Sequence, residues 1–543
     1  MSSIFCLVFL KKEAFKSLYF NILWVKFIKT DISHNYLILD FLILSSSSSS
    51  ITCPMLKNYF FLVFAFIFLN INAQKTYVPD DYFEQALINL GIDKDGVVND
   101  SVATSDISNI ISLDVSDNWI NDLKGIEDFI SLTELYCQKN SLLYLNLEKN
   151  TNLEILNFSH SSDWDLLSLP IDISKNINLK YLNCSGNRLR YLNVDHIPNL
   201  KTLICSFNKL ENINTSQNLK LEHFDCTGND ISNLNLGSNL NLSNFNCSSN
   251  LIKNLNVDKN TKLTILDFSA NQITNINLNK NINLEYLNCG NNLLTTLDLT
   301  KLYSLRVLYC IYNYYLVNLD LSNNINIEEI LCYLNNRLTN LDLTNATALT
   351  YLNCRDNQLS ILDVSTNPNL KVLLCYDNKL TELDITQNIV LTSLNCSSNQ
   401  LIKLDVDNSN NSIITSFSAT NNPNLSCIQV DNETDANNGI APYDSWQKDD
   451  TATYSEDCSA YLGVDNEILA EGLNLYPNPV SDKLIIDSKI PIEKVEIFNI
   501  LGQKEIVINS DFKSIQLNDL TRGFYIIKIY SEKGTTVRKL IKQ

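Results

Sequence analysis

An asparagine recurs every 21 or 22 residues through the middle of this 543-residue chain. It closes a short motif of the form Leu-x-Cys-x-x-Asn, as in residues 182–187 and residues 394–399. A unit of this length cannot enclose a hydrophobic core, so successive units must bury their apolar side chains against one another in a stack. The eleven regularly spaced asparagines are Asn187, Asn208, Asn229, Asn250, Asn271, Asn292, Asn313, Asn335, Asn357, Asn378 and Asn399.

The spacing within each unit predicts its conformation. Leu and Cys alternate, which places both on the inner face of a short strand, and equivalent strands of successive units pair in parallel. The asparagine can satisfy backbone donors and acceptors at the turn that follows the strand. A second apolar pair, such as Leu297 and Leu299, returns along the opposite side of the coil. We expect about fifteen such coils in residues 113–426.

This pattern resembles the leucine-rich-repeat family in its short 21-residue bacterial form. The resemblance implies a repeat solenoid, a β-rich superhelix in which a parallel sheet lines the concave face and caps close both ends. It also implies a protein that binds a partner rather than one that transforms a substrate.

Eleven cysteines occupy the second inward position of the repeat, and Phe158 and Phe268 take the same position in their own coils. We interpret these cysteines as small buried hydrophobic residues. A metal or redox centre would need Cys-x-x-Cys clusters, which the sequence lacks. Disulfides between coils are not expected, because parallel strands hold the side chains about 4.8 Å apart. The eleven are Cys137, Cys184, Cys205, Cys226, Cys247, Cys289, Cys310, Cys332, Cys354, Cys375 and Cys396.

Both ends of the array should carry caps, since an open end exposes apolar side chains and strand edges. Residues 74–112 are the expected N-terminal cap. Within them Val78 to Ile92 should form a helix with an apolar face made of Phe83, Ala86, Leu87 and Leu90.

The expected C-terminal cap spans residues 427–458 and contains Trp446. Cys427 and Cys458 lie beyond the last regular coil, and a cysteine pair of this kind in a secreted protein favours a disulfide. The disulfide would hold the cap over the end of the stack.

After a polar linker at residues 459–472, residues 473–543 form short alternating segments separated by turn residues, which predicts a small all-β sandwich. This segment resembles the type A sorting domain of the type IX secretion system of Bacteroidetes. The resemblance implies that the secretion machinery recognises the segment, which is usually removed, and that many such proteins are then attached to surface lipopolysaccharide. Whether this protein is anchored or released stays open. The residues that carry the resemblance include Tyr476, Pro477, Asn478, Pro479, Gly502, Gly523, Tyr525 and Lys539.

Residues 55–73 have the organisation of a signal peptide. Lys57 precedes an apolar run, and small residues precede an expected cleavage between Ala73 and Gln74. The run is too short to span a bilayer comfortably. Residues 1–54 lie before this leader, and we interpret them as an over-extended start site. A membrane-anchoring extension is the alternative.

Composition and motifs argue against several function classes. The net charge of −19 disfavours a nucleic-acid partner, which would need a basic face. The sequence shows no phosphate-binding glycine loop and no zinc-protease motif near its histidines. Residues 93–96 look like the start of a calcium loop but lack the spacing and the terminal Glu of an EF-hand, so we expect a turn. No catalytic residue, metal or cofactor is expected.

The outward positions of the repeat change in character along the chain. They are small and polar in the early coils, become aromatic and aliphatic from Tyr286 onward, and turn polar again at Ser393. A contiguous apolar patch on a secreted protein usually marks an interaction site, although drift among tolerant surface positions would give the same pattern. The expected ligand-binding patch consists of Tyr286, Val307, Tyr309, Ile311, Leu331, Tyr333, Tyr351, Arg355, Val372, Leu374 and Tyr376.

These features predict a secreted or surface-attached binding or adhesion protein without enzymatic activity. Its ligand, an extracellular protein or a glycan, would lie on the concave sheet, because Tyr-rich surfaces suit either partner. The alternative is a structural surface-coat protein that has no specific ligand.

Overall fold

The computed structural model describes residues 74–160, 171–459, 473–489, 491–499, 503–531 and 534–543. The expected signal peptide, the segment before it and Gly502 lie outside the described residues. The described residues form two separate hydrophobic cores. One runs from Val78 to Tyr454 through the repeat array, and the other lies within residues 473–540.

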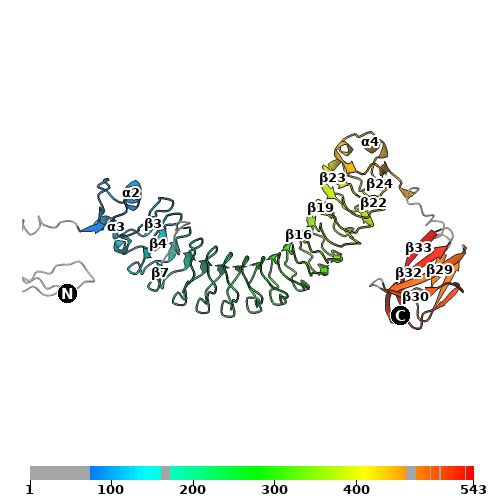
Figure 1. Ribbon diagram of the computed structural model, residues 1–543, viewed down its shortest axis with the longest axis horizontal. Helices are drawn as coiled ribbons and strands as arrows, with labels where there is room; N and C mark the ends of the chain where they lie inside the picture. Colours follow the sequence, from blue (N-terminus) through cyan, green and yellow to red (C-terminus); the bar gives the residue numbers. More distant parts are fainter. Residues whose placement is uncertain (1–73, 161–170, 460–472, 490, 500–502, 532–533) are drawn as a thin grey trace, which may run out of the picture. The chain divides into compact units, whose positions relative to one another are not determined.

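Sixteen strands form one parallel sheet on the inner side of the curved repeat array (Figure 1). Each coil contributes one short strand, and equivalent positions of successive coils stand opposite each other, as Phe224 does opposite Phe245. The strands in chain order are β3 (Ser112–Asp114), β4 (Glu134–Tyr136), β6 (Ile155–Asn157), β8 (Tyr181–Asn183), β9 (Thr202–Ile204), β10 (His223–Asp225), β11 (Asn244–Asn246), β12 (Ile265–Asp267), β13 (Tyr286–Asn288), β14 (Val307–Tyr309), β16 (Glu329–Leu331), β18 (Tyr351–Asn353), β19 (Val372–Leu374), β21 (Ser393–Asn395), β23 (Ser416–Ala419) and β25 (Gln447–Lys448).

Strands on the other side of the coils are fewer and form three small parallel sheets. Leu297 and Leu299 are buried as expected, so the return path packs against the core even where it is not a strand. The three sheets consist of β5 (Leu145–Asn146) with β7 (Ile171–Asp172), of β15 (Asn318–Asp320) with β17 (Asn340–Asp342), and of β20 (Glu382–Asp384), β22 (Lys403–Asp405), β24 (Cys427–Gln429) and β26 (Thr453–Ser455).

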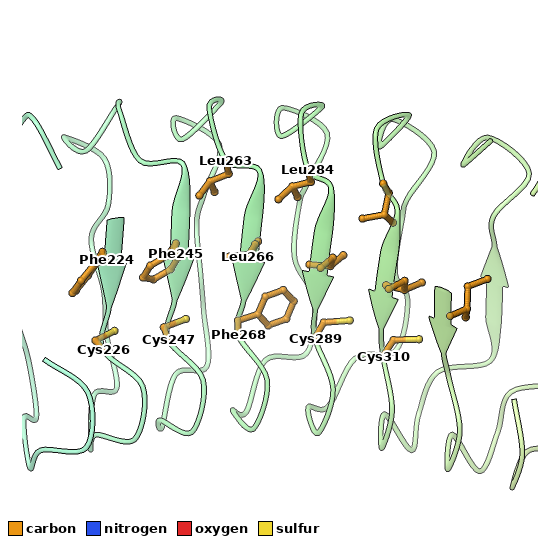
Figure 2. Close-up of a cluster of buried hydrophobic side chains, with 14 of the residues drawn as sticks. Phe224, Cys226, Phe245, Cys247, Leu263, Leu266, Phe268, Leu284, Cys289 and Cys310 are labelled. Carbon is orange, nitrogen blue, oxygen red and sulfur yellow. The ribbon is translucent and has the colours of Figure 1, made fainter. Parts of the chain in front are cut away.

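The interior of the array is a column of stacked side chains. Figure 2 shows Cys226, Cys247, Cys289 and Cys310 in one row, with Phe268 taking the place of a cysteine between two of them. All eleven repeat cysteines are buried thiols that form no disulfide. Burial raises the pKa of the Cys184, Cys354 and Cys396 thiols to about 12, so they behave as small hydrophobic groups at neutral pH.

The repeat asparagines form a buried hydrogen-bonded ladder. The Asn208 side-chain amide donates to the carbonyls of Cys184 and Cys205, both at 3.0 Å. Its oxygen accepts from the backbone N–H groups of Asn187 and Leu189. Each asparagine therefore satisfies backbone groups of its own coil and of the coil before it, which explains why the residue repeats.

A second asparagine ladder, which the sequence had not indicated, lies at the turn before nine of the inner strands. Asn218 is typical, since its side-chain amide donates to the carbonyls of Val194 at 2.9 Å and Ile197 at 2.8 Å in the preceding coil. These asparagines hold successive coils together at the opposite end of the inner strand. Nine residues make this contact: Asn150, Asn176, Asn218, Asn239, Asn260, Asn281, Asn324, Asn367 and Asn388.

The first coil is preceded by β1 (Lys75–Tyr77), helix α2 (Asp81–Asn89), β2 (Ser101–Ala103) and helix α3 (Thr104–Ile107), and a 3-10 turn at Ile126–Asp128 follows in the next coil. Asp80 caps α2 by accepting from the N–H groups of Tyr82 and Phe83, and its other oxygen accepts from Asn121 and Asp122 in the first coil.

One part of the expected helix face is wrong. Phe83, Ala86 and Leu87 are buried, but Leu90 is 50% exposed. The helix ends at Asn89, so Leu90 is the C-cap residue and turns away from the buried face. Glu84 is buried in its place, where its carboxylate accepts from the backbone N–H groups of Asn99, Asp100 and Ser101.

The C-terminal end of the array continues the sheets instead of only covering them. Strand β25 pairs with β23, and β26 pairs with β24, so this segment forms one further coil. Trp446 stacks on Phe417 with 4.1 Å between ring centres, and its indole N–H donates to the Ile414 carbonyl. Helix α4 (Glu433–Asn437) and a 3-10 turn at Tyr443–Ser445 belong to this coil, and another 3-10 turn at Asn411–Ile413 lies in the coil before it.

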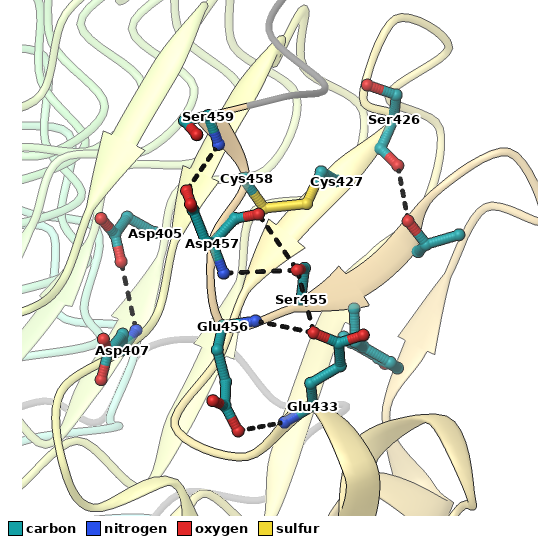
Figure 3. Close-up of a disulfide and its surroundings, with 12 residues drawn as sticks. Asp405, Asp407, Ser426, Cys427, Glu433, Ser455, Glu456, Asp457, Cys458 and Ser459 are labelled. Atoms are coloured by element: carbon teal, nitrogen blue, oxygen red, sulfur yellow. Dashed lines mark hydrogen bonds between the residues drawn. A yellow bond between two sulfur atoms is a disulfide. The ribbon is translucent and has the colours of Figure 1, made fainter.

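Cys427 and Cys458 form a disulfide with their Cα atoms 5.8 Å apart (Figure 3). Next to it, the Ser455 hydroxyl donates to the carboxylate of Glu433, which connects β26 to α4. The two cysteines outside the repeat register thus have a different role from the eleven within it.

Residues 473–543 form a separate β-domain of two antiparallel sheets whose inner side chains share one core. The first sheet contains β27 (Leu473–Tyr476), β28 (Lys483–Ser488) and β31 (Ser514–Gln516). The second contains β29 (Ile492–Asn499), β30 (Lys504–Ile508), β32 (Gly523–Ser531) and β33 (Gly534–Lys542).

Candidate ligand-binding surface

Seven of the eleven residues of the expected patch lie on one face of the inner sheet, and the other four, Ile311, Tyr333, Arg355 and Tyr376, lie just after the ends of its strands. We call all eleven the concave patch. Strands β13, β14, β16, β18 and β19 are consecutive neighbours in the sheet, so their outward residues form rows across it. Tyr286 stands opposite Val307, and Tyr351 stands opposite Val372. Tyr309 stands opposite Leu331 in the second row. All eleven side chains are half-buried, as expected for side chains that cover the sheet and still reach solvent.

Aromatic contacts join the first strands of the patch. The Tyr286 and Tyr309 rings meet edge to face with 5.5 Å between their centres. The Tyr309 hydroxyl donates to the Glu329 carboxylate at 2.9 Å. Burial, followed by this hydrogen bond and the charge of Glu329, raises the pKa of Tyr309 to about 12. Tyr309 is therefore neutral under physiological conditions and holds Glu329 in place.

Arg355 occupies the other end of the patch between two rings. Its guanidinium lies 4.4 Å from the centre of the Tyr333 ring and 5.5 Å from that of Tyr376. It also donates to the Asp356 carboxylate at 2.7 Å. The charge of Arg355 is therefore balanced within the protein.

The sequence pattern missed several members of this surface. Glu329 stands between Val307 and Tyr351 in the first row, and Ile265 extends that row to β12. Tyr312 continues the aromatic surface onto the turn after β14, with its ring 6.2 Å from that of Tyr333. The 21- and 22-residue spacing could have identified Glu329 and Ile265, because both occupy outward strand positions. The turn residue Tyr312 has no such signal.

The residues expected to mark the sorting segment lie in the C-terminal β-domain. Asn478 fixes its loop to β33, since its amide donates to the Lys539 carbonyl and its oxygen accepts from the Ile541 N–H. Tyr525 is buried and its hydroxyl donates to the Thr521 carbonyl. The Lys539 ammonium lies 4.4 Å from the centre of the exposed Phe524 ring.

Within the described residues, no helix is long and apolar enough to cross a membrane. The same residues contain no group of three or more His, Cys, Asp or Glu side chains placed to bind a metal ion.

Comparisons with known proteins agree with both parts of this architecture. Residues 474–543 match the family model of a secretion system C-terminal sorting domain. A segment of this kind indicates that the protein is exported. No curated protein matches the sequence of the chain.

The solved structures that are similar to this chain include two bacterial proteins. The functional domain of InlJ from Listeria monocytogenes, which includes a cysteine ladder, is 23% identical with a TM-score of 0.55, and the match covers 87% of this chain and 99% of that one. A leucine-rich-repeat protein of Leptospira interrogans is 21% identical with a TM-score of 0.50, over 64% of this chain and 97% of that one. At such identities the likeness establishes the fold alone. The protein is a leucine-rich-repeat solenoid that ends in a secretion system C-terminal sorting domain.

Proposed function

We propose that this chain is an exported binding protein that holds an extracellular protein on its concave patch and catalyses no reaction. The observation that carries the proposal is the continuity of the patch over five neighbouring strands. Large aromatic side chains that are half-buried in the free protein lose little conformational freedom on binding and contribute much of the contact energy at interfaces.

The position of the patch supports a partner of appreciable size. It lies on the inner side of the curved array, where side chains from many coils can face one bound molecule (Figure 1). The outward residues on either side are polar, such as Asn244 on β11 and Ser393 on β21. An apolar centre with a polar rim is the usual composition of a protein–protein interface.

The proposal also covers how the protein is exported and which segments of the chain serve export and binding. A signal peptide at residues 55–73 would direct export across the inner membrane, and residues 473–543 would direct passage through the type IX system. The segments at residues 74–112 and 427–458 would serve as caps of the binding domain. The mature protein would be released or attached to the outer surface of the cell.

The test is a binding screen of the purified full chain against an array of extracellular proteins and an array of glycans. Tyr309→Ser combined with Tyr376→Ser should abolish the protein hits. Tyr181→Ser combined with Tyr191→Ser is the matched control, because these tyrosines lie outside the patch on β8 and on the other side of the coil. Hits on glycans alone, or hits that survive the patch substitutions, would contradict the proposal.

A structural surface-coat role is the second candidate, and one observation favours it. In several coils, a half-exposed aliphatic or aromatic side chain lies in the turn that precedes the inner strand. Together these side chains form a row along the array, which could pack against other copies of this chain. The coat role predicts that Leu219→Ser with Ile282→Ser reduces self-association in sedimentation experiments, whereas a ligand-binding protein would be monomeric in both forms. The row consists of Ile130, Ile177, Leu219, Leu240, Ile282, Tyr303, Ile325 and Ile389.

A further inference from the structure

The Glu329 carboxylate lies among tyrosines in the middle of the concave patch. Tyr309 donates to one of its oxygens at 2.9 Å, and Glu329 stands opposite Val307 on one side and Tyr351 on the other. Its neighbours in the row are aliphatic and aromatic, so this carboxylate is a negative charge among mostly apolar side chains. A partner that covers the patch must also cover this charge.

Arg306 and Arg355, which belong to the coils before and after that of Glu329, are already paired with other carboxylates. Arg306 forms two hydrogen bonds of 3.0 Å with Glu328, the residue just before Glu329. Arg355 pairs with Asp356 and lies between two tyrosine rings. Among the ion pairs formed by the described residues, none involves Glu329.

From this arrangement we propose that the partner places a lysine or arginine side chain on Glu329, between Val307 and Tyr351. The inference rests on the proposed function and specifies the partner as a protein segment with a cationic residue flanked by apolar ones. A carboxylate that loses water without gaining an opposite charge is strongly destabilised, so a neutral partner would bind this surface poorly. A cation supplies the counter-charge and also gains from the tyrosine rings.

The other charged groups of the patch also favour a cationic residue on the partner. An acidic residue on the partner would meet Glu329 directly, and Arg355 is already engaged by Asp356. A neutral sugar could stack on the tyrosine rings, but it would leave Glu329 covered and unpaired. The geometry therefore favours a basic peptide segment over an acidic peptide or a neutral glycan.

The experiment uses the purified full chain on an array of nine-residue peptides that differ only in the central residue. The flanking residues are leucine, valine and tyrosine, and the centre is Lys, Arg, Gln or Glu. The native chain should bind the Lys and Arg peptides roughly tenfold more tightly than the Gln peptides. Raising the salt concentration should narrow this preference.

Glu329→Gln removes the charge while keeping the shape, and it should abolish the preference for Lys and Arg. Glu328→Gln is the matched control, because Glu328 is the adjacent carboxylate but pairs with Arg306 away from the patch. An unchanged preference in Glu329→Gln, an equal loss in Glu328→Gln, or no binding of any peptide would each overturn the inference.

The failure of this inference can be separated from the failure of the proposed function. If Tyr309→Ser with Tyr376→Ser abolishes peptide binding but Glu329→Gln leaves the Lys preference intact, the patch binds a peptide and the cation does not lie on Glu329. If the native chain ignores every peptide and binds neutral glycans through the patch, both the cation and the protein partner are wrong.

Discussion

Strands β9–β11 and strands β13, β14, β16, β18 and β19 belong to one sheet with one interior, yet they present different surfaces. Inside, Leu203 and Leu352 are equally buried at the same repeat position. Outside, β9 and β11 present Thr202 and Asn244, whereas β13 presents Tyr286 in the same row. The comparison shows that the inward residues are fixed by the stacking of the coils, whereas the outward residues are free to vary.

The asparagine ladder should give the largest effect, and the effect should appear in both regions in proportion to the N–H groups that each asparagine satisfies. Asn208→Leu, in the polar region, leaves the N–H groups of Asn187 and Leu189 without their buried partner and should lower the free energy of unfolding by about 4 kcal/mol. The carbonyls of Cys184 and Cys205 keep a hydrogen bond from Asn187 and Asn229. Asn357→Leu, beneath the patch, leaves the N–H group of Asn335 without its partner and should cost about 2 kcal/mol. Urea unfolding followed by circular dichroism measures both. A cost below about 1 kcal/mol in either variant would show that the ladder does not hold the coils.

Removal of the disulfide should cause the next largest loss of stability, because the disulfide holds only the end of the array and not its repeated coils. Replacing Cys427 and Cys458 by serine removes a cross-link between residues 31 apart in sequence. The chain-entropy relation predicts a loss of about 3–4 kcal/mol for the segment that it closes. Limited proteolysis should cut this variant first within residues 427–458, and Cys375→Ala should not have that effect. Equal proteolysis of the variant and the native chain would show that the disulfide does not stabilise the cap.

The buried thiols predict how stability depends on alkaline pH. Burial raises the pKa of Cys184, Cys354 and Cys396 to about 12, whereas an exposed thiol in the unfolded chain loses its proton near pH 8.5. Alkaline pH therefore favours the unfolded chain, so the contribution is complete below about pH 8 and decreases as pH rises toward 12. The urea midpoint under reducing conditions should fall between pH 8 and pH 10. The fall should be smaller when the three cysteines are replaced by alanine.

The smallest effect on stability should come from the concave patch. Tyr333→Ser removes a ring that contacts Arg355, a half-exposed interaction that contributes roughly 1 kcal/mol or less. The urea midpoint should hardly move, while binding of the proteins identified on the array should fall sharply. A large loss of stability would place Tyr333 among the residues that fold the array rather than those that bind.

Stacking explains why much of this molecule could be read from its sequence. The Leu, Cys and Asn positions repeat because every coil meets the same neighbour, and the solenoid with its eleven buried thiols was predicted from that spacing. The positions of residues outside the repeat are harder to predict from the sequence. Leu90 was placed on the buried helix face because its spacing fits, but the helix stops one residue earlier.

The second asparagine ladder and Glu329 were missed for another reason. Asn218 and its equivalents lie in turns rich in asparagine, where the buried members look the same as the exposed ones until the coils are stacked. Glu329 was overlooked because the patch had been defined by apolar character, whereas its position in the row depends on strand register. Spacing predicts where a side chain points, but it does not predict which polar groups end up covered.

Crosslinking at one row position in each of the two regions tests the central claim most directly. A photoreactive phenylalanine derivative would replace Tyr351 on β18 in one variant and Tyr181 on β8 in the other, since both tyrosines occupy the first outward position of their strand. Each variant would be irradiated with a protein identified on the array, after its urea midpoint had been shown to match that of the native chain. The account predicts crosslinks from position 351 and none above background from position 181. Equal crosslinking at both positions, or crosslinking from position 181 alone, would contradict it.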